Sequence, residues 1–201
     1  MPNKQSSTLC RQLGHVFAQS QLLQRALTHR SYAPEHNERL EFLGDSVLGC
    51  VIAKHLYDSY PQLSEGELSR LRSNLVREDT LASLAQQLDL GSHLRLGEGE
   101  RKSGGFRRPS ILADAMEALF GAVLLDGGFA DAEKVVLGLY VPYLAKTDVQ
   151  ALGKDAKTLL QEYLQGKRIP LPTYSVVATQ GQAHEQSFEV ECAIPSLKIA
   201  T

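Results

Sequence analysis

Asn37-Glu38-Arg39-Leu40-Glu41-Phe42-Leu43-Gly44-Asp45-Ser46 decides how this chain folds. The stretch opens a helical pattern, and at about 100° per residue Glu38, Glu41 and Asp45 fall within roughly 60° of one another. The stripe on the opposite side, which we expect to face the core, consists of Leu40, Leu43, Val47 and Val51. The pattern then becomes apolar nearly all round, as in a helix that lies inside a domain. We therefore expect the acidic face to line a cleft, where three like charges repel unless a cation joins them.

A second apolar stretch, residues 110–125, carries only two charged residues. These are Asp114 and Glu117, which share one helical face because they are three residues apart. Gly121 follows one turn later and would let another helix approach closely. The alternative is an acidic pair on a solvated face, but a face with so few charges is poorly suited to solvent. The pattern favours a second helix that brings carboxylates into the same cleft.

Two such helices together predict a metal site. The four candidate ligands are Glu41, Asp45, Asp114 and Glu117. A set of ligands that are all oxygen selects hard cations, here Mg²⁺ with Mn²⁺ as a substitute, rather than zinc. The E-x-x-H spacing of di-iron helical bundles is missing, because Gly44 and Phe120 stand where the histidines would be.

The composition is that of a soluble protein of 201 residues, enough for one domain and a smaller second one. Residues 1–144 contain 15 Lys and Arg against 17 Asp and Glu, and if six of these acids share one site the remaining 11 leave a net charge of +4. That balance fits an enzyme acting on a phosphate polymer. No apolar run reaches membrane-spanning length, and the first residues lack the apolar core of a signal peptide. Three widely spaced cysteines fit reduced thiols, so we expect a cytoplasmic protein.

The periodicity predicts a mainly α protein with an all-helical first domain over residues 1–144. The predicted helices cover about 6–13, 21–29, 38–60, 65–75, 79–88, 109–126 and 130–144, with Ser20, Asn37 and Ser64 as N-caps. Residues 145–154 are typical of a linker. Residues 155–201 predict a small α+β domain, with a helix over 155–165 and strands over 174–179 and 186–193.

Residues 96–108 predict a glycine-rich basic loop whose order of residues does not match a phosphate-binding P-loop. Its Arg101, Lys102, Arg107 and Arg108 are candidates for RNA phosphate contacts, and an ordinary solvated loop is the alternative. Phe42 projects beside the acidic face and away from the core stripe. It either packs against a neighbouring helix or inserts into a second subunit.

Residues 37–46 resemble the signature of bacterial ribonuclease III. Three further segments, Thr28-His29-Arg30-Ser31, residues 102–108 and residues 110–117, are similar to that family in the same order. The resemblance spans essentially the whole chain. It implies a homodimeric, all-helical endonuclease domain followed by a domain that binds double-stranded RNA.

The resemblance also implies roles for particular residues. It implies that Glu41, Asp45, Asp114 and Glu117 are metal ligands. It also implies a catalytic role for Asp45 and Glu117, and for Glu38 and Glu65, which would line the same cleft. It implies that Phe42 plugs into the partner subunit. In the second domain it implies RNA contacts by Thr158, Gln161, Glu162 and His184, in keeping with recognition of A-form RNA by shape.

The activity implied is divalent-metal-dependent hydrolysis of double-stranded RNA in rRNA and mRNA processing. The products would carry 5′-phosphate and 3′-hydroxyl ends with short 3′ overhangs. A dimeric protein that binds RNA duplexes without cutting them is the rival interpretation. The residues after Ile194 show neither the third strand nor the lysine-rich second helix that the resemblance implies. The chain is therefore expected to be either a shortened form or part of a longer protein.

Overall fold

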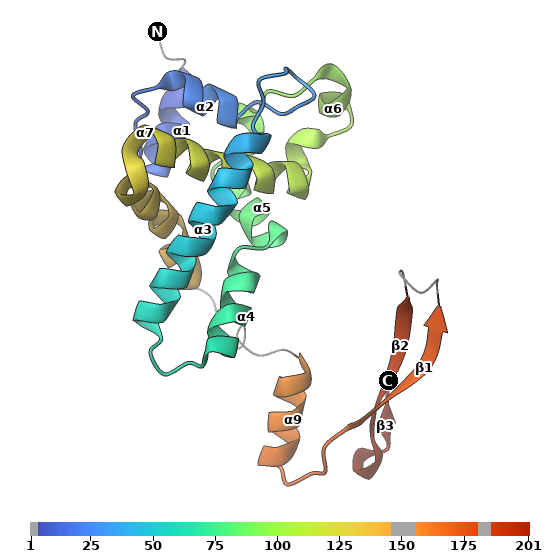
Figure 1. Ribbon diagram of the computed structural model, residues 1–201. Coiled ribbons are helices and arrows are strands. Elements are labelled where there is room, and N and C mark those ends of the chain that lie inside the picture. The colour runs from blue at the N-terminus through green and yellow to red at the C-terminus, as the bar shows by residue number, and fades with distance from the viewer. Residues whose placement is uncertain (1–3, 146–155, 181–185) are drawn as a thin grey trace. The chain divides into compact units, whose positions relative to one another are not determined.

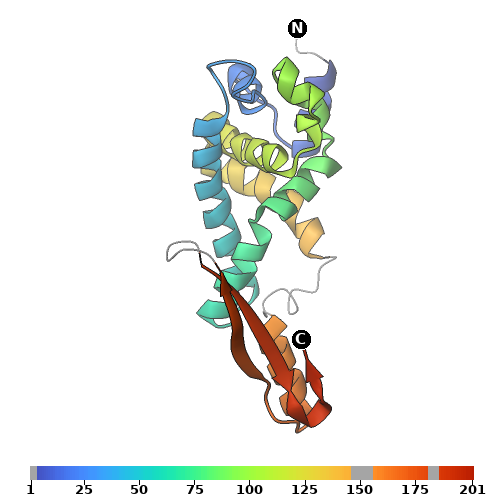
Figure 2. The same ribbon diagram turned by 90° about the vertical axis from the view of Figure 1, so that its right-hand side faces the viewer.

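The computed structural model describes residues 4–145, 156–180 and 186–201 (Figures 1 and 2). The chain divides into two compact units, Met1–Gly153 and Lys154–Thr201. The predicted linker, residues 145–154, lies almost wholly outside the described residues.

The described part of the first unit is helical, which confirms the prediction of an all-helical domain. Its helices are α1 (Lys4–Leu13), α2 (Ser20–Ala26), α3 (Glu38–Ser59), α4 (Glu65–Leu75), α5 (Glu78–Gln87), α6 (Glu98–Lys102) and α7 (Pro109–Leu144), with short 3₁₀ helices at Leu90–His93 and Gly105–Arg107. In these residues extended pairing is limited to one isolated bridge between Thr28 and Arg95. None of the helices in the described parts of the chain is both long enough and apolar enough to cross a membrane.

Helices α3 and α7 form the centre of this unit and pack against each other, as Figures 1 and 2 show. Leu48 and Ile52 of α3 are fully buried, as are Met116 and Phe120 of α7. Helix α5 also packs on α7. The apolar character of α3 and α7, read from the sequence as that of helices inside a domain, is thus explained by burial on more than one side.

Helix α7 is interrupted between the two helices that were predicted over residues 109–126 and 130–144. Gly128 has a φ of 82° and a non-helical backbone, so α7 consists of two helical segments joined at a kink. The carboxylate of Asp126, just before the kink, accepts hydrogen bonds from the backbone N–H groups of Ala18 and Gln19 and contacts His15 Nε2 at 2.9 Å. Burial opposes ionisation of Asp126, but these hydrogen bonds outweigh it and hold its pKa below the ordinary value. The start of α2 is therefore tied to α7.

Of the three predicted N-caps, one is confirmed and two differ from the structure. Ser64 forms the predicted capping box with Glu67. Ser20, however, is the first residue of α2, and that helix ends at Ala26 rather than near residue 29. Asn37 precedes α3 and is buried, and its backbone N–H donates to the carbonyl of Thr28. It makes no side-chain capping bond, because its backbone is already helical (φ −83°, ψ −16°) rather than extended as in a capping residue.

The predicted loop at residues 96–108 is more ordered than its glycines indicate, since it contains α6 and a 3₁₀ helix. An ion pair of 2.8 Å between Arg108 Nη1 and Glu100 Oε1 links the two. Ser103 Oγ also donates to Glu100 Oε1 and to the Glu100 carbonyl. Charged residues therefore stabilise a short helical turn here.

The second unit contains α9 (Ala156–Gly166), β1 (Thr173–Gln180), β2 (Ser187–Ile194) and β3 (Ile199–Ala200). The strands form an antiparallel sheet in the order β1-β2-β3. The short β3 corrects the expectation that no third strand follows Ile194. Thr201 and Cys192 exchange backbone hydrogen bonds beside it, at 2.8 and 3.1 Å. Two residues are too few for the alternation that reveals a strand in a sequence.

Candidate metal centre

Two glycines allow α3 and α7 to come into backbone contact beside the predicted site. A Cβ atom on Gly44 would overlap the backbone carbonyl of Glu117, and one on Gly121 would overlap the carbonyl of Leu40. Both neighbours are backbone atoms, so no side-chain rotation would relieve the overlap. The prediction that Gly121 permits close approach of another helix is confirmed. This contact fixes the separation between the acids of the two helices.

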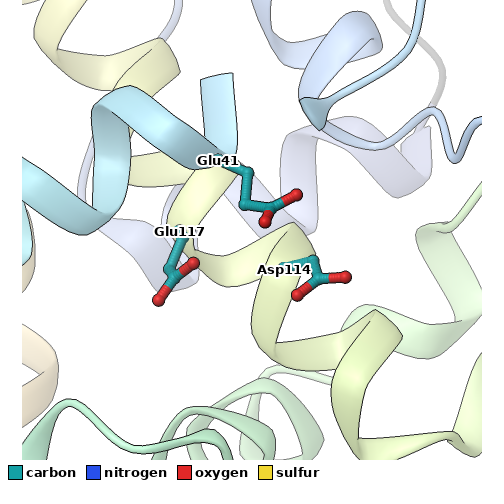
Figure 3. A group of neighbouring side chains, drawn as sticks. All are labelled: Glu41, Asp114 and Glu117. Atoms are coloured by element: carbon teal, nitrogen blue, oxygen red, sulfur yellow. The ribbon is translucent and has the colours of Figure 1, made fainter. Parts of the chain in front are cut away.

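Three of the predicted carboxylates meet across that contact. Glu41 extends from α3 toward Asp114 and Glu117 of α7 (Figure 3). Each residue offers a carboxylate oxygen, and these three oxygens lie within 4.8 Å of one another. All three side chains are partly buried. We call Glu41, Asp114 and Glu117 the carboxylate cluster.

Burial and mutual repulsion raise the pKa of every acid in the carboxylate cluster. Burial, and then the charges of Asp45, Glu41 and Asp114, raise the pKa of Glu117 from 4.5 to about 8. Burial followed by neighbouring acids also raises the pKa of Glu41 and of Asp114. A divalent cation among the oxygens would offset this repulsion, and hard oxygen donors suit Mg²⁺ or Mn²⁺. The residues therefore fit the metal that the sequence predicts.

Asp45, the fourth predicted ligand, lies outside the cluster. Its side chain is exposed on α3, one turn after Glu41. Its charge nevertheless raises the pKa of both Glu117 and Glu41, after the effect of burial. Asp45 thus contributes to the potential at the site from its edge, and its role as a ligand stays a prediction.

Glu38 and Glu65, predicted to line the same cleft, occupy different surroundings. The carboxylate of Glu38 lies 3.2 Å from Arg30 Nη1 and 3.8 Å from His36 Nδ1. Glu65 begins α4, is exposed, and accepts a hydrogen bond of 2.8 Å from Ser69 Oγ. Neither belongs to the carboxylate cluster. Glu38 is linked to it electrostatically, because its charge helps to raise the pKa of Glu41 after burial and Asp114.

The basic residues predicted to contact RNA differ in their partners. Lys102 Nζ pairs with Glu98 Oε1 at 2.6 Å, and Arg108 pairs with Glu100 as described above. The guanidinium of Arg107 lies 5.0 Å from the centre of the Phe106 ring. Arg101 and Arg107 help to line a groove whose apolar wall includes Leu94, Leu96, Phe106 and Leu112. Arg108 is thus partly a structural residue, a role that its position in a basic run did not reveal.

In the second unit, α9 carries Gln161, which is partly buried, and Glu162, which is exposed. The side chain of Thr158 lies outside the described part of the structure, as do residues 181–185 with His184. The predicted RNA contacts of these residues stay predictions.

Phe42 presents a large apolar surface next to the cluster. Its side chain is 77% exposed on α3, directly after Glu41. Packing against a neighbouring helix of the same chain, one of the two interpretations of the sequence, is therefore excluded for the described residues. Insertion into a second subunit stays a prediction.

One segment near the site was given no role from the sequence alone. His29, Arg30 and Ser31 form part of the loop before α3, and burial is the main cause of a lowered pKa at His29. Charges from Glu100, Arg30, Asp114 and Glu38 also act on this imidazole. The sequence pointed to this segment only through the similarity of Thr28-His29-Arg30-Ser31 to ribonuclease III. The residue types and their spacing alone do not indicate a function.

Both units of the chain match known protein families. Residues 19–144 match the family model described as Ribonuclease-III-like, and residues 156–201 match the Double-stranded RNA binding motif. The chain is 64% identical to Ribonuclease 3 of Bordetella avium over 193 residues, 96% of this chain and 77% of that protein. It is 62% identical to Ribonuclease 3 of Thiobacillus denitrificans over 94% of this chain and 84% of that protein.

Solved structures support the same assignment for the fold. A crystal structure of the nuclease domain of ribonuclease III from Campylobacter jejuni has a TM-score of 0.69 and 40% sequence identity, covering 74% of this chain and all of that one. A second structure of this domain, reported for flexibility in its region of dimer formation, has a TM-score of 0.65 and 42% identity over 66% of this chain and 93% of that one. The chain belongs to the ribonuclease III family.

Proposed function

We propose that this chain is an endoribonuclease that hydrolyses phosphodiester bonds in double-stranded RNA with the help of a divalent cation. The observation that carries the proposal is the carboxylate cluster, where two central helices of a ribonuclease III fold bring three acids together with raised pKa values. Partly burying several like charges reduces the stability of a protein, so such a cluster is typical of a functional site. Hydrolysis by a metal-activated water is such a function.

Glu41, Asp114 and Glu117 are the proposed holders of Mg²⁺ or Mn²⁺, with Asp45 as the fourth ligand. When bound, the cation would lower the pKa of a water molecule and polarise the phosphate. Glu117, with a pKa of about 8 before metal binding, must lose its proton to bind a cation. Glu41 and Asp114 would hold the cation from different helices, so its place in the site would depend on the α3–α7 contact. Glu38 and Glu65 are proposed as residues that line the approach to the site.

The products and biological role are further proposals that follow from family membership. We propose 5′-phosphate and 3′-hydroxyl ends with short 3′ overhangs, and roles in rRNA and mRNA processing. Two copies of the chain, each with one site, would cut both strands. Residues 156–201, which match the Double-stranded RNA binding motif, would hold the duplex.

Cleavage of an end-labelled RNA duplex tests the proposal. The wild-type chain with Mg²⁺ should produce discrete fragments, and excess EDTA should stop the reaction. Glu117→Gln should keep the fold and reduce the rate by at least about a thousandfold, because a neutral amide cannot replace a charged ligand. Full activity in EDTA or in Glu117→Gln would refute the metal mechanism. Tight binding of the duplex with no cleavage in Mg²⁺ or Mn²⁺ would favour the non-cleaving RNA-binding protein instead.

A further inference from the structure

Arg30 lies in the loop before α3 and directs a positive charge at the acidic site. Its Nη1 is 3.2 Å from Glu38 Oε1. Glu38 is one helical turn before Glu41, the member of the carboxylate cluster that α3 contributes (Figure 3). Burial and neighbouring acids raise the pKa of Glu41 and Asp114, whereas the charge of Arg30 acts in the opposite direction at both. Arg30 is therefore close enough to influence acids on both helices.

The pair between Arg30 and Glu38 is easily exchanged for another. The side chain of Arg30 is 71% exposed and that of Glu38 is 47% exposed. Exposed ion pairs contribute little to stability because water and salt screen them. The paired N–H donors of a guanidinium can bind two oxygens of one phosphate at once. That contact is stronger than the single contact between Arg30 and Glu38.

His36 lies close enough to Glu38 to become its partner in place of Arg30. Its other carboxylate oxygen, Oε2, lies 3.8 Å from His36 Nδ1, just beyond hydrogen-bond distance. His36 Nδ1 is buried and has no hydrogen-bond partner among the residues that the structure describes. A shift of Glu38 by a few tenths of an ångström would satisfy this nitrogen. Departure of Arg30 would therefore not leave Glu38 without a contact.

The backbone that carries Arg30 is held in place on both sides. The N–H of His29 donates to the carbonyl of Arg95, and Ser31 Oγ accepts a hydrogen bond of 3.0 Å from the N–H of Gly97. A Cβ atom at Gly97 would overlap the carbonyl of Ser31, so the two segments touch directly. The loop thus presents an exposed guanidinium from a backbone that is held in place, which suits a residue that must meet a ligand.

We propose that Arg30 binds a phosphate of the RNA strand beside the cleavage site and that it leaves Glu38 to do so. Glu38 holds the guanidinium near the carboxylate cluster in the free protein and turns to His36 when RNA binds. This inference rests on the proposed function, because it takes a phosphodiester at the cluster as the substrate. It adds a phosphate ligand from a loop that is separate from the basic residues of 101–108.

The first test compares Arg30→Ala with Arg30→Lys and with Lys54→Ala as a matched control. Lys54 is an exposed cation on α3 that also pairs with a carboxylate, Asp58 Oδ2, at 3.0 Å. Position 54 is about 20 Å along the helix from Glu41. Arg30→Ala should raise KM for a short duplex about tenfold with little change in kcat, because a lost phosphate contact weakens substrate and transition state alike. Arg30→Lys should recover only part of this loss, because lysine keeps the charge but not the paired donors of the guanidinium, and Lys54→Ala should resemble the wild type.

The second test asks whether Glu38 competes with RNA for Arg30. Binding is measured with Ca²⁺ in place of Mg²⁺ for the wild type, Glu38→Gln, Arg30→Ala and the double variant. Glu38→Gln should tighten binding about threefold when Arg30 is present and leave it unchanged in Arg30→Ala. General loss of a negative charge would instead tighten binding equally in both backgrounds. Arg30→Ala should also lower the slope of log K against log salt by about one, as expected for one lost phosphate contact.

Several outcomes would overturn the inference. One is an unchanged KM and an unchanged salt slope in Arg30→Ala. Another is tighter RNA binding in Glu38→Gln that persists in the absence of Arg30. A third is a lowered melting temperature in Arg30→Ala, which would indicate a structural role. The proposed function fails separately: in that case the wild-type chain itself does not cut the duplex. Cleavage by the wild type together with normal kinetics in Arg30→Ala would refute the role of Arg30 alone.

Discussion

At the scale of single residues, Glu117 shows how burial and neighbouring acids change the protonation of the site. Its carboxyl group is partly buried, and three other acids lie near enough to raise its pKa further. Protonation relieves the repulsion when no cation is bound, so the free protein near neutral pH holds a proton where the working enzyme would hold a metal. Glu117, one of the proposed metal ligands, is thus an acid that resists being charged until a cation replaces its proton.

The stability of the metal-free protein should therefore fall as pH rises between about 4.5 and 8. In this range the unfolded chain has already lost the Glu117 proton while the folded chain retains it, so each rise in pH favours unfolding. Glu117→Gln keeps a neutral side chain at every pH and should flatten this dependence. Chemical denaturation in EDTA at several pH values measures the free energy of unfolding. The same slope in wild type and variant would show that the pKa of Glu117 is not raised.

Binding of Mg²⁺ should reverse the effect. Because the cation and the proton compete for Glu117, adding Mg²⁺ should raise the melting temperature more at about pH 8.5 than at about pH 6. Glu117→Gln should lose most of this gain, whereas Lys54→Ala should keep it. Differential scanning calorimetry with Mg²⁺ and with EDTA provides the comparison. A gain independent of pH in the wild type would mean that the cation binds elsewhere.

At the scale of elements, the site depends on how closely α3 and α7 approach. Gly44 and Gly121 place the backbones of the two helices in contact, so the distance between Glu41 and Glu117 is set by main-chain atoms. Main-chain contacts adjust less than side-chain contacts do. A small increase in the helix separation would therefore open the carboxylate cluster directly.

Gly44→Ala should both destabilise the protein and reduce cleavage. Its new Cβ atom would overlap the carbonyl of Glu117, and relief requires the helices to move apart, at a cost of about 1–3 kcal/mol. Gly49→Ala is the matched control on the same helix, because a Cβ there meets nothing within 4 Å. It should stabilise the protein by about 0.5–1 kcal/mol, since alanine favours helix over glycine. Equal stability and activity in the two variants would show that the close contact is not needed.

The helices and the centre of the site could be predicted from the sequence because both depend on local periodicity. Glu41, Asp114 and Glu117 stand out as acids on otherwise apolar helices, and the structure brings them together. Periodicity gives the direction of a side chain around one helix but not its distance from a second helix. For that reason Asp45 could not be told apart from the three cluster members.

Long-range contacts explain the other differences between prediction and structure. Asn37 has the right residue type and position for a cap, but contact with Thr28 buries it. The two residues of β3 form a strand only because β2 lies beside them. Arg30 received no role, since its place near the acids depends on contacts between the loop and residues 95–97. None of these contacts leaves a periodic pattern in the sequence.

At the scale of the whole molecule, the two units divide the work between cutting and holding RNA. The first contains the carboxylate cluster and the loop with Arg30, and the second matches the Double-stranded RNA binding motif. Neither unit accounts for Phe42, whose exposure next to the cluster is costly for a side chain that meets only water. A second copy of the chain would cover it and place two sites in one assembly. Cutting both strands of a duplex calls for such an assembly.

Phe42→Ala should therefore weaken self-association by at least about tenfold, equivalent to about 1.4 kcal/mol, because a buried aromatic anchor would be lost. Tyr57→Ala is the matched control: Tyr57 is also on α3 and is 73% exposed, about 22 Å further along the helix. Sedimentation velocity over a range of protein concentrations would measure both variants against the wild type. Since Phe42 faces solvent within one chain, its removal should leave the melting temperature of the monomer nearly unchanged. Dimers of equal strength in Phe42→Ala and the wild type would assign this side chain a role other than contact with a second copy.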